Sequence, residues 1–143
     1  MKMHGGAMEF TPYLNFNGQC EVAFNFYQRT FGGKLEAMVN HEGTPAAQHV
    51  PAEWLKKIML ARLNVNGKML MGADSQPNGY QTPKGFCVSI QVKEPKEADR
   101  IFNKLAEGGE VDLPIQQTFW AVRFGMLRDR YGIPWMINFE QGS

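Results

Sequence analysis

The chain has 143 residues, of which 43% are hydrophobic and 20% are charged, and its formal net charge is +1 at pH 7. This length suits one domain or two small halves that share a core, and the composition is ordinary for a globular protein. The scattered basic residues give no electrostatic footprint for nucleic acid or a membrane surface, and no apolar run approaches the ~20 residues that a bilayer needs.

The first residues of the chain are not expected to belong to the folded domain. Residues 1–7, with His4 followed by two glycines, look like a flexible extension or a cloning remnant, so the single domain is predicted over residues 8–143. No apolar segment typical of a secretory signal is present. Only two cysteines occur, Cys20 and Cys87, and they fit neither a metal site nor a disulfide. A reducing, cytoplasmic compartment is therefore expected.

Taken in order, the chain first predicts a strand over residues 9–16, which are rich in Thr, Tyr and Phe. Pro12 places this strand at a sheet edge or a bulge, because proline donates no ladder hydrogen bond. Asn17 is a plausible N-cap for the helix that follows over residues 19–31, where apolar side chains recur at helical spacing. Gly32-Gly33 then ends this helix.

Three more strands are predicted in this half, over residues 34–40, 58–66 and 68–74. Asn66-Gly67 joins the last two and is the strongest two-residue hairpin signal. The intervening polar segment, residues 41–53, is long enough to be a lid or a binding loop. Trp54 closes it, either as an anchor in the core or as an aromatic lid residue.

The second half begins with a strand over residues 85–92 and a helix over residues 95–107, which has proline in its first turn and ends at Gly108-Gly109. A strand over residues 111–117 contains Pro114 and is therefore bulged or at an edge. The final hairpin, residues 117–138, combines two tryptophans with few polar side chains.

The same order of elements thus occurs twice, in modules of about residues 9–75 and 85–140. Each module reads strand, helix, Gly-Gly and three strands. A helix laid on a four-stranded sheet leaves the other face of that sheet open. The sequence therefore predicts an α+β fold of paired βαβββ modules, whose curved mixed sheets surround a cavity suited to a small molecule.

Several short segments together carry a family resemblance. They are Pro12 to Phe16, Ala23 to Tyr27, Phe31 to Gly33, Met69 to Asp74, Thr118 to Ala121, Arg123 to Gly125 and Asp129 to Asn138. The chain resembles the vicinal oxygen chelate superfamily of glyoxalase, bleomycin-resistance and dioxygenase proteins. Within it, the chain is similar to the PhnB-like branch, which bears 3-demethylubiquinone methyltransferase-like descriptions. The resemblance implies a homodimer with cavities between paired modules.

The resemblance also implies where metal ligands would lie, on the first and last strand of each module. These positions fall at Thr11 or Pro12, at residues 72–74, at Phe86 or Cys87, and at Met136. They offer one carboxylate, one thiol and one thioether, whereas a divalent ion needs several converging oxygen or nitrogen donors. The three histidines (His4, His41 and His49) lie in the extension and the long loop. We therefore expect no metal and no cofactor.

Trp120 and Arg123 are the leading candidates for ligand binding, because an indole and a guanidinium hold planar or anionic molecules. The alternative is that Trp120 anchors the core or a dimer interface and that Arg123 pairs with Asp129 across the hairpin. If Met136 lines the hollow, strand alternation points Asn138 into it as well.

Because side chains alternate along the last strand, Trp135 then points to the opposite face and packs under a helix. Three further side chains are weaker candidates. Asp74 is a general base or the cap of a turn. Cys87 is a nucleophile or an inert buried thiol, and Tyr80 covers the cavity mouth or lies on the surface.

Three functions remain open from the sequence. The first is binding or sequestering of an aromatic or anionic small molecule, without a metal. The second is a metal-dependent lyase, isomerase or dioxygenase, which needs ligands that the chain does not show. The third is a ligand-free scaffold whose aromatic side chains serve the dimer interface.

Overall fold

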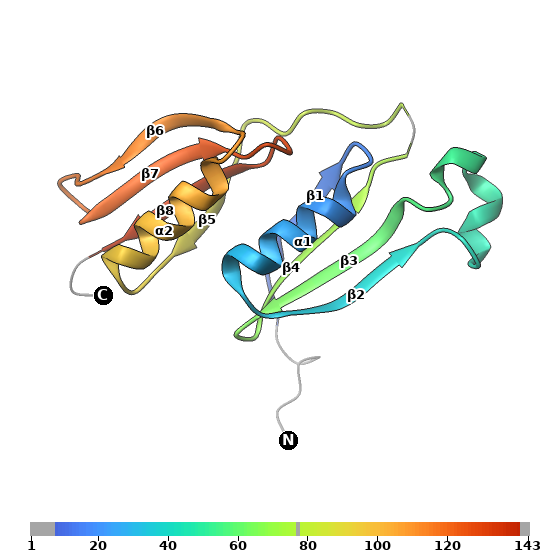
Figure 1. Ribbon diagram of the computed structural model, residues 1–143, viewed down its shortest axis with the longest axis horizontal. Helices are drawn as coiled ribbons and strands as arrows, with labels where there is room; N and C mark the ends of the chain where they lie inside the picture. The colour runs from blue at the N-terminus through green and yellow to red at the C-terminus, as the bar shows by residue number, and fades with distance from the viewer. Residues whose placement is uncertain (1–7, 77, 141–143) are drawn as a thin grey trace, which may run out of the picture.

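The computed structural model describes residues 8–76 and 78–140, and the predicted extension, residues 1–7, lies outside the described residues. The first half of the chain forms β1 (Tyr13–Phe16), α1 (Cys20–Phe31), β2 (Lys34–Asn40), β3 (Ile58–Val65) and β4 (Lys68–Asp74) (Figure 1). The second half forms β5 (Val88–Gln91), α2 (Pro95–Ala106), β6 (Glu110–Gln116), β7 (Arg123–Arg128) and β8 (Pro134–Phe139). Two 3-10 helices, η2 (Pro45–His49) and η3 (Ala52–Trp54), lie within the predicted long loop.

The two halves repeat one topology. The strand order is β1-β4-β3-β2 in the first sheet and β5-β8-β7-β6 in the second. In each sheet the first strand of the module pairs in parallel with the last, and the other pairings are antiparallel. The predicted α+β fold of two βαβββ modules is therefore confirmed.

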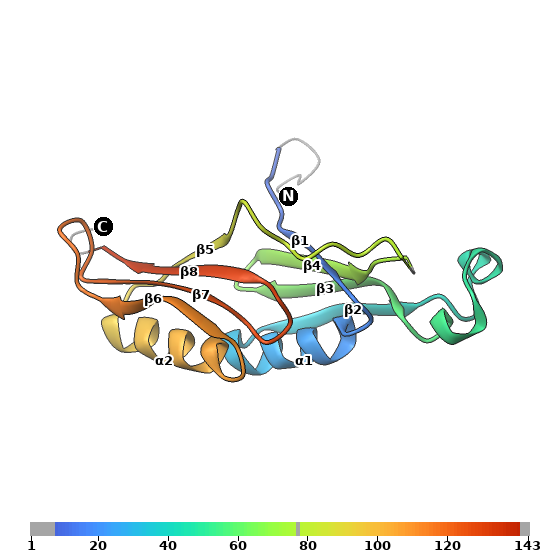
Figure 2. The same ribbon diagram turned by 90° about the horizontal axis from the view of Figure 1, so that it is seen from above.

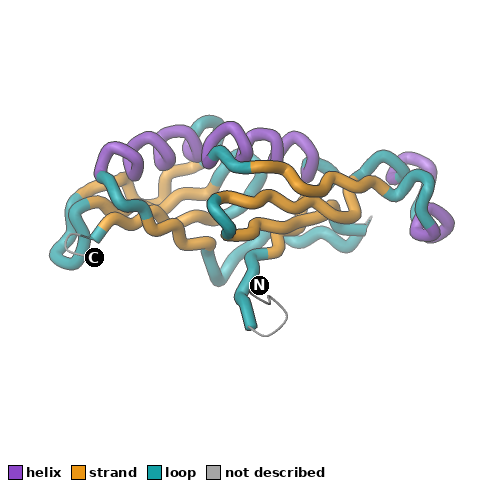
Figure 3. The backbone as a smooth tube through the Cα atoms, turned by 90° about the horizontal axis from the view of Figure 1, so that it is seen from below, coloured by secondary structure: helices purple, strands orange, loops and turns teal. Residues whose placement is uncertain are grey.

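Both helices lie on the same side of the molecule, and the two sheets form the layer opposite them (Figure 2). Seen from below, α1 and α2 run along one edge of the molecule, with the strands of both modules beneath (Figure 3). We call the sheet surface that faces away from the helices the open face of each module. Neither helix in the described part of the chain combines the length and apolar composition that a bilayer crossing requires.

A single hydrophobic core joins the modules on the helix side of the sheets. The ring of Tyr27, from α1, meets the indole of Trp135, from β8, with centroids 5.4 Å apart and planes at 69°. Trp135 is only 1% exposed, as predicted for a side chain packed under a helix. Aromatic pairs in this edge-to-face geometry add to the burial of apolar area, so the junction is a stable part of the fold.

Close packing against the sheet explains the second glycine of the pair that follows each helix. A Cβ atom on Gly33 would collide with the carbonyl oxygen of Asn64, at the end of β3. A Cβ atom on Gly109 would collide with the carbonyl oxygen of Arg128, at the end of β7. The chain therefore leaves each helix so close to the sheet that only glycine fits, and both modules use the same solution.

Some predicted boundaries and contacts differ in the structure. The first strand is shorter than residues 9–16, because its pairing begins where the carbonyl of Pro12 accepts the amide of Met71. Asn17 is not the N-cap of α1: Gln19 holds that position without a side-chain hydrogen bond. The carboxylate of Asp74 serves the helix instead, accepting the Cys20 amide at 2.9 Å.

Candidate ligand-binding site

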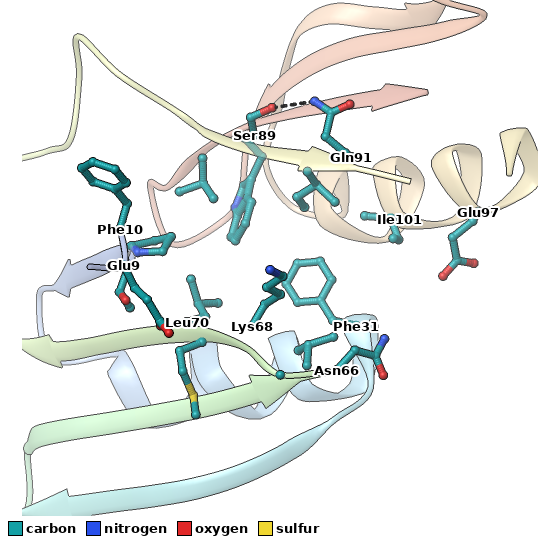
Figure 4. A pocket seen from close by; sticks show the side chains of 18 of the residues that line it. Glu9, Phe10, Phe31, Asn66, Lys68, Leu70, Ser89, Gln91, Glu97 and Ile101 are labelled. Atoms are coloured by element: carbon teal, nitrogen blue, oxygen red, sulfur yellow. Dashed lines mark hydrogen bonds between the residues drawn. The ribbon is translucent and has the colours of Figure 1, made fainter. Parts of the chain in front are cut away.

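A cleft of about 890 Å³ lies between the two modules (Figure 4). Its apolar floor includes Phe31, Leu70 and Ile101, and charged side chains such as Lys68 and Glu97 stand around it. The seven side chains that the sequence singles out for ligand binding lie outside its lining. None of the predicted binding residues therefore lines this cleft.

Strand register brings two of the predicted residues, Met136 and Asn138, to the open face of the second sheet, and a ring contact adds Trp120. Met136 pairs with Met126, and Asn138 pairs with Phe124, so these four side chains share one face. The indole of Trp120 lies edge-on against the ring of Phe124, with centroids 5.2 Å apart, and Trp120 is 48% exposed. The result is an apolar surface of two rings and two thioethers, with one amide beside it.

The amide of Asn138 has an unsatisfied acceptor. Its Nδ2 donates to Gln91 Oε1 and to Glu140 Oε2, both at 2.8 Å. Its Oδ1 is buried and meets no hydrogen-bond donor among the described residues. Buried acceptors are nearly always satisfied, because leaving one unpaired costs about 1–3 kcal/mol. The amide is thus a polar group at the edge of the apolar surface, and its acceptor has no partner among the described residues.

Arg123 lies on the other side of the same sheet. Its Nε donates to Asp99 Oδ1, in α2, at 3.1 Å, so the guanidinium faces the helix. The alternative pairing with Asp129 is wrong, because the oxygens of Asp129 are already engaged. They accept hydrogen bonds from Tyr27, Trp135 and the amides of the turn. The structure therefore separates Arg123 from Trp120 instead of bringing them to one face.

Asp74 is buried, and each of its oxygens accepts a backbone amide. Oδ1 takes the amide of Cys20 and Oδ2 takes that of Ile58, at 2.9 and 2.8 Å. These contacts fix the start of α1 to the start of β3. The cap predicted for a local turn is thus a long-range cap of a helix, with the carboxylate at the positive end of the helix dipole.

The remaining candidates lie in loops and turns outside the strands of the two sheets. The thiol of Cys87 is partly buried, just before β5. The hydroxyl of Tyr80 lies over Gly132, in the turn between β7 and β8. Trp54 donates its Nε1 hydrogen to the carbonyl of Ser75 at 3.0 Å, which supports its reading as an anchor.

The positions that the resemblance assigns to metal ligands do not fit a divalent ion. Asp74 is committed to backbone amides, and Met136 offers only a thioether. His41 is buried, and its Nδ1 lies 2.9 Å from the carbonyl oxygen of Lys57. Residues 8–76 and 78–140 hold no group of three His, Cys, Asp or Glu side chains placed to bind a metal.

The sequence analysis missed one residue on the open face of the first sheet. Arg62, in the central strand β3, pairs with Met71 of β4 and with Ala37 of β2. Its neighbours Ala61 and Leu63 are fully buried on the helix side, so Arg62 faces the other way. A charged residue within an alternating central strand was the signal that could have revealed it.

Residues 8–138 match the protein family described as 3-demethylubiquinone-9 3-methyltransferase. The chain belongs to this family. It is 33% identical to protein YjdN of Escherichia coli strain K12 over 139 residues, covering 92% of this chain and 95% of that protein. The predicted resemblance to the PhnB-like branch, with its 3-demethylubiquinone methyltransferase-like descriptions, is thus confirmed, and solved structures of the glyoxalase/bleomycin-resistance group share the fold.

Two solved structures show the same architecture over most of their length. The crystal structure of protein PA1353 from Pseudomonas aeruginosa is 46% identical, with a TM-score of 0.86, covering 94% of this chain and 98% of that one. The PhnB protein of Bacillus cereus, described as a putative 3-demethylubiquinone-9 3-methyltransferase, is 23% identical, with a TM-score of 0.77, covering 92% and 99%. At that identity the second likeness concerns the fold alone.

Proposed function

We propose that the protein binds a small organic molecule on the open faces of its sheets, without the usual metal site of the superfamily. The observation that carries this proposal is the surface formed by Trp120, Phe124 and Met136 beside the unsatisfied Oδ1 of Asn138. Apolar walls with a few directed polar groups are the usual composition of small-molecule sites. Such a surface has no evident structural purpose if it stays in water.

The proposal includes a homodimer. Both open faces lie on the same side of one chain, so a second copy would have to cover them (Figure 2). Large apolar side chains are exposed in this region, among them Tyr13 at 49%, Phe86 at 60% and Phe119 at 95%. Contact between copies would bury them and would let two modules line each cavity. The two free cysteines agree with a reducing, cytoplasmic compartment, which is part of the proposal.

A thermal-shift screen over aromatic and anionic metabolites tests the binding function. A ligand that binds the folded state raises the free energy of unfolding by about 2.7 kcal/mol at a concentration 100 times its Kd. We expect a subset of compounds to raise the melting temperature of the wild type. Trp120→Ala should abolish the shift while the dimer persists, and Phe119→Ala, which changes a more exposed neighbouring ring, should keep it.

Two other outcomes would favour the other functions. If no compound raises the melting temperature and Trp120→Ala dissociates the dimer, the surface is an interface and the protein is a ligand-free scaffold. If purified protein holds a stoichiometric divalent ion, a metal-dependent lyase, isomerase or dioxygenase replaces the proposal. Elemental analysis of the protein, purified without chelators, distinguishes that case.

A further inference from the structure

We infer that Arg62 binds the anionic group of the ligand, so that the small molecule carries a carboxylate or a phosphonate. This inference rests on the proposed function and specifies its ligand. Arg62 lies on the open face of the first module, in the row that β-sheet register builds from Ala37, Arg62, Met71 and Tyr13. The neighbours in this row are apolar or aromatic, and none carries a charge.

Arg62 differs from the other partly buried arginines of the described chain. Arg123 is paired with Asp99 at 3.1 Å, and Arg128 donates to the carbonyls of Pro83 and Gly132 at 2.8 and 3.1 Å. Arg62 is also partly buried, yet within residues 8–76 and 78–140 its guanidinium makes neither a hydrogen bond nor an ion pair. A guanidinium carries five donors, and partial burial without a partner is unfavourable.

The charged groups around Arg62 do not compensate for it. Glu36 of β2 is the acidic side chain nearest in register, and its Oε2 instead accepts Asn64 Nδ2 at 2.8 Å. The residues that β1 and β4 present to this face are Tyr13, Asn15, Met69, Met71 and Ala73, none of them acidic. The guanidinium therefore keeps its donors for a group that comes from outside the chain.

The chemistry of that group follows from the arginine. A guanidinium presents parallel N–H donors that match the two oxygens of a carboxylate or a phosphonate. The thioether of Met71 lies directly opposite the arginine in the strand pairing, and that of Met69 lies opposite Asn64, two residues further along β3. These side chains favour an apolar or aromatic body attached to the anion. A flat organic anion thus suits both parts of the surface better than a free inorganic ion does.

The test compares probes that differ in charge. Indole-3-carboxylate, its neutral amide and phenylphosphonate are titrated into the dimeric wild-type protein by calorimetry. We expect the two anions to bind at least about tenfold more tightly than the amide, with a preference that shrinks as salt is added. Arg62→Met should remove the preference and leave the amide affinity within about twofold, since the methionine keeps most of the apolar stem.

Arg123→Met is the matched control, because it removes a partly buried arginine that already has a partner, and it should keep the preference for anions. Arg62→Lys should retain part of it. Three results overturn the inference about Arg62: equal affinity for the anions and the amide, an unchanged preference in Arg62→Met, or dissociation of the Arg62→Met dimer in size-exclusion chromatography. The last result would mean that Arg62 pairs with an acid of the second copy. In each case, binding of neutral aromatic compounds would leave the proposed function standing, whereas absence of binding by every compound would remove both.

Discussion

The hydroxyl of Tyr27 donates a hydrogen bond to the carboxylate of Asp129, which lies 102 residues further along the chain. Tyr27 belongs to the first module and Asp129 to the second, so this bond crosses the junction between them. The same carboxylate accepts Trp135 Nε1 at 2.8 Å and the amides of Tyr131 and Ile133. One buried acid thus fixes the turn between β7 and β8, orients an indole and holds the other module.

Tyr27→Phe should lower the free energy of unfolding by about 1–3 kcal/mol, because it withdraws one donor from a buried carboxylate. Urea denaturation at pH 7 measures this loss. Tyr13→Phe is the control, since Tyr13 is 49% exposed, and it should change stability by less than about 0.5 kcal/mol. Equal stability of the two variants would show that the bond across the junction contributes nothing.

The same pair predicts a pH dependence. Burial, together with the charge of Asp129, raises the pKa of Tyr27 well above its ordinary value of 10.0. The unfolded chain therefore releases this proton first as the pH rises. The contribution of Tyr27 is complete below about pH 10 and declines above it. Between pH 9 and pH 11 the wild type should lose more stability than Tyr27→Phe does. Parallel curves for the two proteins in thermal melts would contradict this expectation.

Asp74→Ala should destabilise the first module by about 2–4 kcal/mol, because it leaves the buried amides of Cys20 and Ile58 without an acceptor. Asp99→Ala also removes a carboxylate, but its pair with Arg123 is partly exposed, at 41% and 36% of the two side chains. That pair should contribute no more than about 1 kcal/mol. Denaturant titration of both variants gives the comparison, and a smaller loss in Asp74→Ala than in Asp99→Ala would be incompatible with the role assigned to Asp74.

The two cysteines should differ in reactivity. Cys20 is fully buried, and burial, with the nearby charge of Asp74, raises the pKa of its thiol far above the ordinary value. The native protein at pH 8 should therefore react with a thiol reagent such as DTNB only at the partly buried Cys87. Cys87→Ser should abolish the fast reaction, and addition of denaturant should restore one thiol. Rapid labelling of native Cys87→Ser would contradict this.

Substitutions at Gly32 and Gly33 can distinguish two reasons for a glycine: a positive φ angle and a lack of space for a Cβ atom. Both have positive φ, at 80° and 86°, so alanine is strained at either position. A Cβ atom at Gly32 meets open space, whereas at Gly33 it collides with the carbonyl of Asn64. Gly33→Ala should therefore cost about 1–3 kcal/mol more than Gly32→Ala. Thermal unfolding of the two variants measures the difference, and equal melting temperatures would leave the backbone conformation as the sole cause.

Local signals predicted the elements of the fold well, because each acts within a few residues. Pro95 marks the start of α2, Gly32-Gly33 follows α1, and Asn66-Gly67 makes the β3–β4 hairpin with φ of 53° and 86°. The order of these elements then disclosed the duplication. The sheet register could be inferred less well, as the shortened β1 shows.

Side-chain partners were predicted poorly where they depend on distant elements. Asp74 caps a helix that begins 54 residues earlier, and Arg123 pairs with Asp99 of α2, 24 residues away. Local sequence patterns do not reveal contacts between residues so far apart in the chain. Alternation within β8 did predict that Met136 and Asn138 share a face opposite Trp135, because that inference needs only one strand.

The topology has one more consequence. In the described chain every strand pairs only with strands of its own half, and residues 75–87 are the only covalent connection between the sheets. A protease cut in that segment would break no backbone ladder. The halves would then stay associated through non-covalent contacts, among them the Tyr27–Asp129 hydrogen bond and the ring packing of Tyr27 on Trp135. Limited digestion should therefore yield a nicked protein that remains assembled.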